Sequence, residues 1–112
     1  MLQFVQFIEK IHQVIEENLD NSDFNIDTIA STIGLSRSAF FKKLKSLTGF
    51  APVDLVKEIR LNKSIELIKN SDMSISEIAF AVGFKDSGYF SKCFRKKYDQ
   101  TPREYMNEWR KG

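Results

Sequence analysis

The sequence predicts an all-α protein in which two helix-turn-helix units are joined by a long bridging helix. Apolar residues recur at helical spacing along most of the chain, and one pattern of helix, glycine turn and helix occurs twice. The first copy is IDTIASTIGLSRSAFFKKLKSLT, about residues 26–48, and the second is ISEIAFAVGFKDSGYFSKCFRKKY, about residues 75–98. Because two copies of one unit present similar surfaces, the repeat predicts two similar docking surfaces.

Matching residues place the two copies in register. Before the turn, the matches lie 49 positions apart and pair Ile26, Ile29, Ala30 and Gly34 with Ile75, Ile78, Ala79 and Gly83. After the turn, they lie 50 positions apart and pair Phe40, Lys42 and Pro52 with Phe90, Lys92 and Pro102. The turn of the second copy is therefore one residue longer. Each turn contains a glycine, which adopts a left-handed backbone conformation without a Cβ clash.

The first predicted helix covers residues Leu2–Leu19. Its apolar residues follow helical spacing and are Phe4, Ile8, Ile11, Ile15 and Leu19. We interpret His12, the only histidine, as a surface residue because no ligand or base partner accompanies it. A polar link, Asn21–Asn25, follows this helix.

The first repeat begins with a support helix, Ile26–Ile33, which ends at the Gly34 turn. Ser36 is a suitable N-cap for the next helix, which is predicted over Arg37–Leu47. Residues at positions i, i+4 and i+7 of that helix are expected to point inward, and they are Phe40, Leu44 and Leu47. Outward positions hold Ser38, Phe41, Lys42 and Lys45. For Phe41, a place in the core is an equally good alternative, because aromatic side chains in a small domain are usually buried.

A long helix is predicted from Pro52 to about Lys69. Proline suits a first helical turn, where its missing N–H costs nothing. The apolar residues alternate between two sides of this helix and are Leu55, Ile59, Leu61, Ile65 and Ile68. A helix that is apolar on two sides packs against partners on both, so this one is predicted to bridge the two units and fix their separation. Its basic residues suit contacts with phosphates or neighbouring acids, and they are Lys57, Arg60 and Lys63.

The second repeat follows a link at Asn70–Ser74. Its first helix carries an apolar face of Ile78, Ala79 and Val82 and ends at Gly83. Asp86 is a suitable N-cap for the second helix. One stripe of that helix faces inward and consists of Phe90, Cys93, Phe94 and Lys97. We interpret Cys93, the only cysteine, as a small buried hydrophobic residue in a reducing compartment.

The last predicted helix is capped by Thr101 and has Pro102 at its first position. Asp99 stands before it at a helix end that favours glycine, so some backbone strain is expected there. Three residues are predicted to close the core beneath the second unit, and they are Tyr105, Met106 and Trp109.

The second copy and the residues after it, SISEIAFAVGFKDSGYFSKCFRKKYDQTPREYMNEWR, resemble the signature region of AraC-type transcription regulators. The resemblance covers about Phe7 to Arg110 and is most specific over Ile75–Tyr105. It implies one DNA-binding domain, residues 1–112, with seven helices: two helix-turn-helix units (about 26–48 and 75–98) and one bridging helix (about 52–69). The stretch SRSAFFKKLKSLTGFAPVDLVKEIRL further resembles the version found in hybrid two-component sensor-regulators.

The resemblance also implies which residues face DNA. In the family, base edges are reached by the first and second turns of the first recognition helix and by the matching positions of the second. The matching residues here are Ser38, Phe41, Lys42, Ser87, Gly88, Ser91 and Lys92. Lys42 is suited to donate to guanine O6 or N7, and Phe41 is suited to meet a thymine methyl group. Gly88 departs from the polar side chain usual at its position, so base readout by the second helix is expected to be thin. Phosphate contacts are expected at Ser36, Arg37, Lys45, Tyr89, Arg95 and Lys96, and Arg60 is expected to be structural.

A net charge of +2 hides a strong asymmetry. Residues 1–34 contain one Lys and six Asp or Glu, whereas residues 35–112 contain sixteen Lys or Arg and nine Asp or Glu. The basic excess begins with the first predicted recognition helix, which indicates a polyanionic partner. A solvated basic face is the alternative interpretation, but the presence of basic residues on both copies favours nucleic acid.

Other functional classes find little support. One histidine, one cysteine, and the absence of a glycine-rich phosphate loop or a metal-spaced cluster argue against an enzyme, a cofactor or a metal site. No base-stacking platform indicates RNA binding. No apolar run approaches the roughly 18 residues of a membrane span, and no signal peptide is evident, so a cytoplasmic protein without membrane contact is expected.

The leading hypothesis is therefore sequence-specific binding of double-stranded promoter DNA that regulates transcription. Two recognition helices are expected in adjacent major-groove segments, which lie about 34 Å apart on one face of the duplex. The alternative is a helical protein-interaction module with only non-specific DNA affinity, which would use the acidic first helix and Trp109. We also expect the chain to be the C-terminal output piece of a longer regulator with an upstream sensor or receiver domain, and RNA polymerase to be a further partner.

Overall fold

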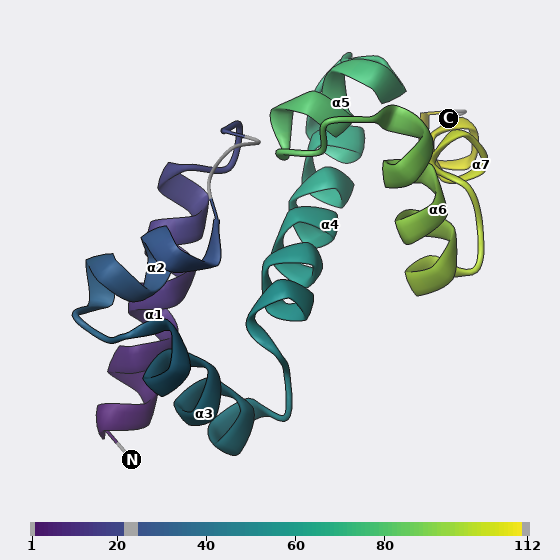
Figure 1. The fold of residues 1–112 in the computed structure, drawn as a ribbon. Helices are drawn as coiled ribbons and strands as arrows, with labels where there is room; N and C mark the ends of the chain where they lie inside the picture. Colours follow the sequence, from purple (N-terminus) through teal and green to yellow (C-terminus); the bar gives the residue numbers. More distant parts are fainter. Residues whose placement is uncertain (1, 22–24, 111–112) are drawn as a thin grey trace. The chain divides into compact units, whose positions relative to one another are not determined.

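The computed structural model describes residues 2–21 and 25–110, which form seven α-helices and no strand (Figure 1). The helices are α1 (Leu2–Glu17), α2 (Ile26–Ile33), α3 (Arg37–Thr48), α4 (Pro52–Asn70), α5 (Ile75–Ala81), α6 (Ser87–Tyr98) and α7 (Pro102–Arg110). The predicted all-α class with seven helices is therefore confirmed. The chain divides into two compact units, residues 1–59 (unit 1) and 60–112 (unit 2), and the boundary falls inside α4.

Unit 1 is held together by apolar side chains from α1, α2, α3 and the first turns of α4. The buried ones are Phe7, Ile11, Val14, Ile15, Leu19, Ile29, Ala30, Phe40, Leu44, Leu55 and Ile59. The rings of Phe7 and Phe40 meet edge to face, with centroids 6.3 Å apart. Because Phe40 and Leu44 lie one turn apart on α3, their burial decides which face of α3 turns outward.

Helix α1 ends at Glu17, two residues before the predicted end at Leu19. Beyond Glu17 the backbone tightens, since the N–H groups of Asn18 and Leu19 donate to carbonyls three residues earlier, at 3.2 and 3.4 Å. The Asn18 side-chain amide also donates to the Val14 carbonyl at 2.9 Å, and thereby takes the acceptor that the next helical hydrogen bond would use. Residues 22–24 of the predicted polar link lie outside the described residues.

Two apolar stripes in unit 1 differ from the prediction. On α1, Phe4 is exposed, because the buried stripe runs through Phe7 and Ile11 instead. On α3, Leu47 was expected to point inward but keeps 39% of its accessible surface. The inward stripe continues at i+4 from Leu44 to Thr48, whose hydroxyl donates to the Leu44 carbonyl at 2.8 Å. Leu47 is one residue out of phase with that stripe and faces solvent.

Local signals set the bounds of α2 and α3 in unit 1. Helix α2 begins after Asn25, whose side chain accepts from the Thr28 N–H, and it ends at Gly34, which adopts a left-handed conformation with φ of 87°. Ser36 then caps α3 by accepting from the Ala39 N–H at 3.1 Å. This geometry confirms the predicted turn and N-cap.

Unit 2 has an aromatic core beneath α6. Its buried side chains include Leu61, Ile68, Ile78, Ala79, Val82, Phe84, Phe90 and Phe94. The rings form a chain in which Phe90 lies 5.2 Å from Phe84 and 5.8 Å from Phe94, and Phe94 lies 5.8 Å from Tyr105 of α7. These ring contacts pack α6 against the turn before it and against α7 after it.

The helix ends of unit 2 are satisfied by side chains. Ser74 and Glu77 form a reciprocal capping box at the start of α5, with hydrogen bonds of 2.9 and 3.1 Å. Thr101 and Glu104 exchange the equivalent pair at the start of α7, at 2.8 and 3.1 Å, which confirms Thr101 as a cap. Asp99 has a φ of 61°, so the strain predicted at that helix end is also present.

Helix α7 departs from its predicted packing at Trp109. That residue was expected in the core, but 52% of its surface is exposed and its ring is covered by the Lys69 ammonium group, 4.6 Å from the ring centroid. Tyr105 and Met106 are half-buried, as is Cys93, which was expected to be fully buried. Cys93 lies beside the Phe90–Phe94 stripe rather than on it, because successive helical residues are separated by about 100°.

The end of α7 is fastened by Arg110. Its guanidinium donates to three backbone carbonyls, those of Ile68 at 3.1 Å, Ser71 at 2.7 Å and Met73 at 3.0 Å. These carbonyls lie at the C-terminal end of α4 and in the link to α5, where a helix leaves acceptors without partners. Arg110 therefore joins the last helix of unit 2 to the first.

Within residues 2–21 and 25–110, no helix combines the length and the apolar character that a membrane span would require.

Candidate nucleic-acid interface

Helix α3 presents its three predicted base-facing residues on one exposed surface. Ser38, Phe41 and Lys42 follow the spacing i, i+3 and i+4, which places them together on one side of a helix. All three are exposed, and Phe41 keeps 47% of its accessible surface. The alternative in which Phe41 belongs to the core is therefore wrong. We call Ser38, Phe41 and Lys42 the α3 face.

The other cations of α3 have partners within the molecule. Arg37 pairs with the Asp27 carboxylate at 3.1 Å, Lys43 lies 4.6 Å from the Phe7 ring centroid, and Lys45 donates to the Gly49 carbonyl at 2.9 Å. Lys42 is the cation of α3 for which the described part of the chain supplies no such partner. It is thus the ammonium group most readily available to an incoming ligand.

The two predicted phosphate contacts among those cations remain accessible. Arg37 and Asp27 have side chains that are 68% and 62% exposed, and an ion pair so exposed contributes little, so its partners exchange easily. Lys45 is also exposed. Ser36 caps α3 with its oxygen as the acceptor, which leaves its hydroxyl hydrogen free to donate.

Helix α6 offers a less open version of the same surface. Phe90 and Phe94 are fully buried and fix the helix on unit 2. Of the four predicted base-facing residues, Gly88 and Lys92 are exposed, whereas Ser87 and Ser91 are half-buried. We call these four residues the α6 face. It contains one basic side chain and no exposed apolar one.

The N-cap Asp86 occupies the free backbone N–H groups at the start of α6. Oδ1 of Asp86 accepts from the N–H of Gly88 at 2.6 Å and from that of Tyr89 at 3.2 Å. A Cβ atom built onto Gly88 would lie 3.0 Å from the same oxygen. A Cβ at position 88 would therefore require the Asp86 carboxylate to shift by a few tenths of an ångström, and glycine leaves this N-cap undisturbed where a polar side chain is usual in the family.

The C-terminal half of α6 is basic. Arg95, Lys96 and Lys97 lie in its last turn, where cations complement the helix dipole. Arg95 and Lys96, two of the predicted phosphate contacts, are exposed. Tyr89, the third on this helix, is 51% exposed and its ring lies 6.0 Å from that of Phe84. Arg95 and Lys96 therefore add an exposed positive charge beyond the α6 face, whereas Tyr89 lies in the first turn of the helix.

Two residues of α4 hold α6 and its turn in place. Arg60 donates to the carbonyl of Gly83 in the turn at 2.9 Å, and its Nε and Nη2 are buried without a partner in the described residues. Burial lowers the pKa of Arg60 from its ordinary value, yet arginine stays charged in proteins. Asn62 accepts from Lys97 at 2.7 Å and from the Tyr98 hydroxyl at 3.1 Å. Arg60 is thus structural, as the resemblance implied.

Sequence reasoning missed Asn62 and Asp27 as polar partners of the two recognition helices. Both are polar residues within helices, and the partners of Asn62 lie 35 and 36 positions away. No pattern in the sequence links residues at such separations, because only the packing of α6 against α4 brings them together. Asp27 was likewise not singled out, although it lies ten positions before Arg37.

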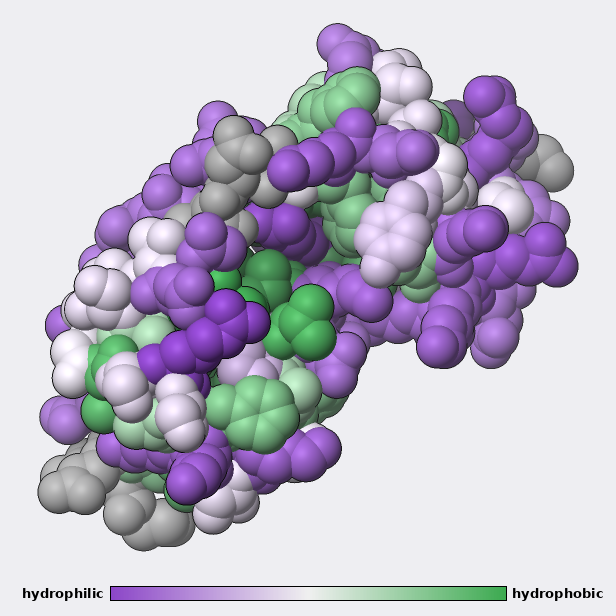
Figure 2. Space-filling view, viewed as in Figure 1, coloured by the Kyte–Doolittle hydropathy of each residue, from purple (hydrophilic) through white to green (hydrophobic). Residues whose placement is uncertain are grey.

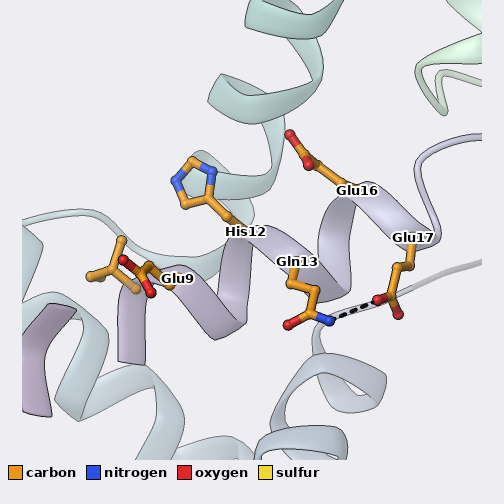
Figure 3. A pocket seen from close by; sticks show the side chains of 6 residues that line it. Glu9, His12, Gln13, Glu16 and Glu17 are labelled. Carbon is orange, nitrogen blue, oxygen red and sulfur yellow. Dashed lines mark hydrogen bonds between the residues drawn. The ribbon is translucent and has the colours of Figure 1, made fainter. Parts of the chain in front are cut away.

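A shallow hollow of about 520 Å³ lies elsewhere, along α1 (Figure 3). Its lining residues come from α1 alone and are Ile8, Glu9, His12, Gln13, Glu16 and Glu17. The Gln13 side chain donates a hydrogen bond to the Glu17 carboxylate at 3.0 Å, so one of the three glutamates that line the hollow has a partner. Because the lining carries negative charge and no predicted DNA contact, the hollow does not belong to the candidate interface.

Hydrophilic side chains cover most of the face in Figure 2, but several apolar side chains also reach the surface. In unit 1 the exposed large apolar residues are Phe4, Val5, Phe41, Leu47, Phe50 and Val53, and in unit 2 they are Phe80, Tyr89 and Trp109. Single exposed apolar residues are normal on a soluble protein. Phe41 is distinguished from the others by its place beside Lys42, for which the described residues supply no ion-pair or hydrogen-bond partner.

Known proteins resemble this chain in sequence. The family described as a helix-turn-helix domain matches residues 29–108. Histidine kinase P4 of Formosa agariphila is 38% identical over 104 residues, which are 93% of this chain and 8% of that protein. The HTH-type transcriptional regulator MtrA of Neisseria gonorrhoeae is 34% identical over 98 residues, 88% of this chain and 32% of that protein. The chain therefore spans less than a third of the length of either relative.

Solved structures resemble it in fold. A transcriptional regulator with an AraC-type DNA-binding domain from Chromobacterium violaceum superposes with a TM-score of 0.86 at 27% identity, covering 97% of this chain and 96% of that one. The DNA-binding domain of the transcription factor AdpA, solved with a target DNA, gives a TM-score of 0.84 at 28% identity, covering 94% of this chain and 93% of that one.

Proposed function

Because this chain belongs to the AraC-type helix-turn-helix family of DNA-binding domains, we propose that it binds double-stranded promoter DNA through both of its repeats. Helix α3 enters one major-groove segment and α6 enters the next. The α3 face and the α6 face meet base edges, while the flanking basic residues bind phosphates and hold the protein in register.

The predicted family and its general function are confirmed. Sequence-specific DNA binding in transcription regulation is the function of this domain family, which is not a class of enzymes. The assignment of individual residues to bases or phosphates is part of the proposal, as is the division into repeats at about 26–48 and 75–98 with a bridge at about 52–69.

One observation carries the proposal. In both repeats a buried phenylalanine, Phe40 or Phe90, anchors the helix after the turn, and an exposed lysine two residues later points away from the core. These lysines, Lys42 and Lys92, lie 50 positions apart and so occupy the same place in each repeat. A lysine at that place can donate to guanine O6 or N7 in a major groove.

The test is a salt-titrated binding assay on promoter fragments from the source genome, with Lys42→Ala and Lys92→Ala beside the wild type. If about six phosphates are contacted, affinity falls by roughly a thousandfold between 50 and 200 mM salt. Lys10→Ala is the matched control, because Lys10 is an exposed lysine on α1, outside both repeats. Loss of fragment preference in both variants, but not in the control, is the expected result.

Other outcomes would redirect the proposal. If only Lys42→Ala reduced the preference, α6 would act mainly on phosphates. Binding that is absent at low salt, or equal on every sequence, would contradict specific recognition by this chain. The protein-interaction alternative, with the acidic α1 and the exposed Trp109 as its surface, would then be favoured.

The wider role of the protein is also proposed. The histidine kinase relative supports an output domain that serves a sensor or receiver domain in a longer cytoplasmic regulator, and promoter binding supports RNA polymerase as a further partner. Immunoblotting of the native gene product with an antibody against this chain tests the first point, since a natural product of 112 residues would contradict it.

A further inference from the structure

The two recognition helices differ in what they offer to a base, and the difference is visible position by position. Residues of α3 correspond to residues of α6 that lie 50 positions later, so Ser38, Phe41 and Lys42 correspond to Gly88, Ser91 and Lys92. The lysines are equivalent, but the other two pairs are not. Helix α3 has a hydroxyl and an aromatic ring where α6 has no side chain and a half-buried hydroxyl.

The first turn of α6 has no side chain at position 88 that could make the contact offered by Ser38 on α3. Asp86 holds two backbone N–H groups of the first turn, and a Cβ at Gly88 would meet its carboxylate at 3.0 Å. The carboxylate also places a negative charge where α3 has the neutral cap Ser36. Since DNA phosphates are anionic, the first turn of α6 is less favourable to close approach than the first turn of α3.

On α3, by contrast, the aromatic ring is presented openly. Phe41 is 47% exposed and makes no ring contact within the described residues, whereas Phe40 beside it is buried against Phe7. Ser38, three positions earlier, is an exposed neighbour of Phe41 on this helix, and the exposed Lys42 follows Phe41 in the sequence. An apolar ring in this setting fits the one apolar group that a major groove displays, the C5 methyl of thymine.

We propose that Phe41 reads a thymine methyl group, and that the sequence preference of this chain is carried mainly by the α3 face. The proposal rests on the proposed function, because it assigns one chemical feature of the DNA to one side chain of that interface. Lys42 donates to a purine acceptor next to the thymine, and α6 contributes affinity through its basic C-terminal half.

The experiment begins with the preferred duplex, obtained by selecting randomised DNA with the full chain at near-physiological salt. Each thymine in it is then replaced singly by deoxyuridine, which removes the C5 methyl group and keeps the pairing edge. Wild type, Phe41→Ala, Phe41→Leu and the matched control Phe80→Ala, which removes an exposed phenylalanine outside both faces, are titrated against the thymine and deoxyuridine duplexes. Circular dichroism confirms that each variant is folded.

At one thymine, deoxyuridine is expected to weaken wild-type binding by about fourfold, the effect of one methyl group removed from an apolar contact. Phe41→Ala is expected to bind the thymine duplex roughly tenfold more weakly, and to bind the two duplexes equally. Phe41→Leu keeps an apolar side chain and is expected to retain part of the discrimination. Phe80→Ala is expected to discriminate as the wild type does.

Three results would overturn the inference and leave the proposed function intact: a preferred duplex in which deoxyuridine has no effect at any position, a Phe41→Ala variant that still discriminates thymine from deoxyuridine, or an equal loss of discrimination in Phe80→Ala. Failure of the proposed function looks different, because selection would then yield no preferred duplex at all.

Discussion

Arg110 provides the most direct test of how unit 2 is held together. Replacing it with alanine removes donors from three carbonyls, those of Ile68, Ser71 and Met73, at 3.1, 2.7 and 3.0 Å. A net contribution of about 1 kcal/mol per hydrogen bond gives about 3 kcal/mol, which partial access of water to a half-buried site reduces to about 2–3 kcal/mol. The positive charge also lies near the C-terminal end of α4, where it is favourable by a few tenths of a kcal/mol.

For a chain of 112 residues, such a loss lowers Tm by about 10 °C. Thermal and urea unfolding followed by circular dichroism measure the change. Arg110→Lys is expected to recover only part of the stability, because a single ammonium group cannot reproduce the planar fork of a guanidinium. The matched control is Arg103→Ala on the same helix, an exposed arginine whose loss is expected to change stability by less than about 0.5 kcal/mol. Equal behaviour of Arg110→Ala and Arg103→Ala would refute the role assigned to Arg110.

Four further substitutions test three individual features. Leu44→Ala, in the core of unit 1, is expected to cost about 3 kcal/mol in urea unfolding, whereas Leu47→Ala is expected to cost less than about 1 kcal/mol; a reversed order would contradict the observed phase of α3. Asp99→Gly is expected to raise Tm by relieving about 0.5–1 kcal/mol of left-handed strain, and a lower Tm would show that the aspartate is favoured there. The N–H of Ser74 lowers the pKa of Glu77 below its ordinary value of about 4.5, so the carboxylate stabilises the fold above that pH and this contribution is lost as pH falls through the lowered pKa. Glu77→Gln is therefore expected to reduce Tm at pH 7 but not at a pH below the lowered pKa. A Tm difference that does not depend on pH would exclude this cause.

Much of the fold could be predicted because its signals are local. Ser36, Ser74 and Asp86 act on N–H groups within three residues, and Gly34 and Gly83 set the turns by their own conformations. The wrong predictions concern residues whose burial depends on the exact phase of a helix or on tertiary packing. Sequence spacing did not determine whether Leu47 or Thr48 continues the inward stripe of α3, since both lie within one turn of Leu44.

The candidate site was predictable to the extent that exposure follows from helical phase. Burial of Phe40 turns Phe41 and Lys42 outward, so those two residues could be placed on the surface in advance. The supports Asn62 and Arg110 could not be found, because their partners lie 35 to 42 positions away in the sequence. The close approach of the Asp86 carboxylate to Gly88 could not be predicted either, since it depends on a distance of 3.0 Å between Oδ1 of Asp86 and a Cβ built at position 88.

The fastening made by Arg110 has a consequence for the order in which unit 2 folds. Its three hydrogen bonds span 42, 39 and 37 positions, whereas the bonds within each helix span four. Closing a long loop costs conformational entropy before its contacts can form, so we expect the helices of unit 2 to form early and α7 to dock late. An interaction absent from the folding transition state acts on the unfolding rate. Arg110 is therefore expected to slow the unfolding of unit 2 and to have little effect on its folding rate.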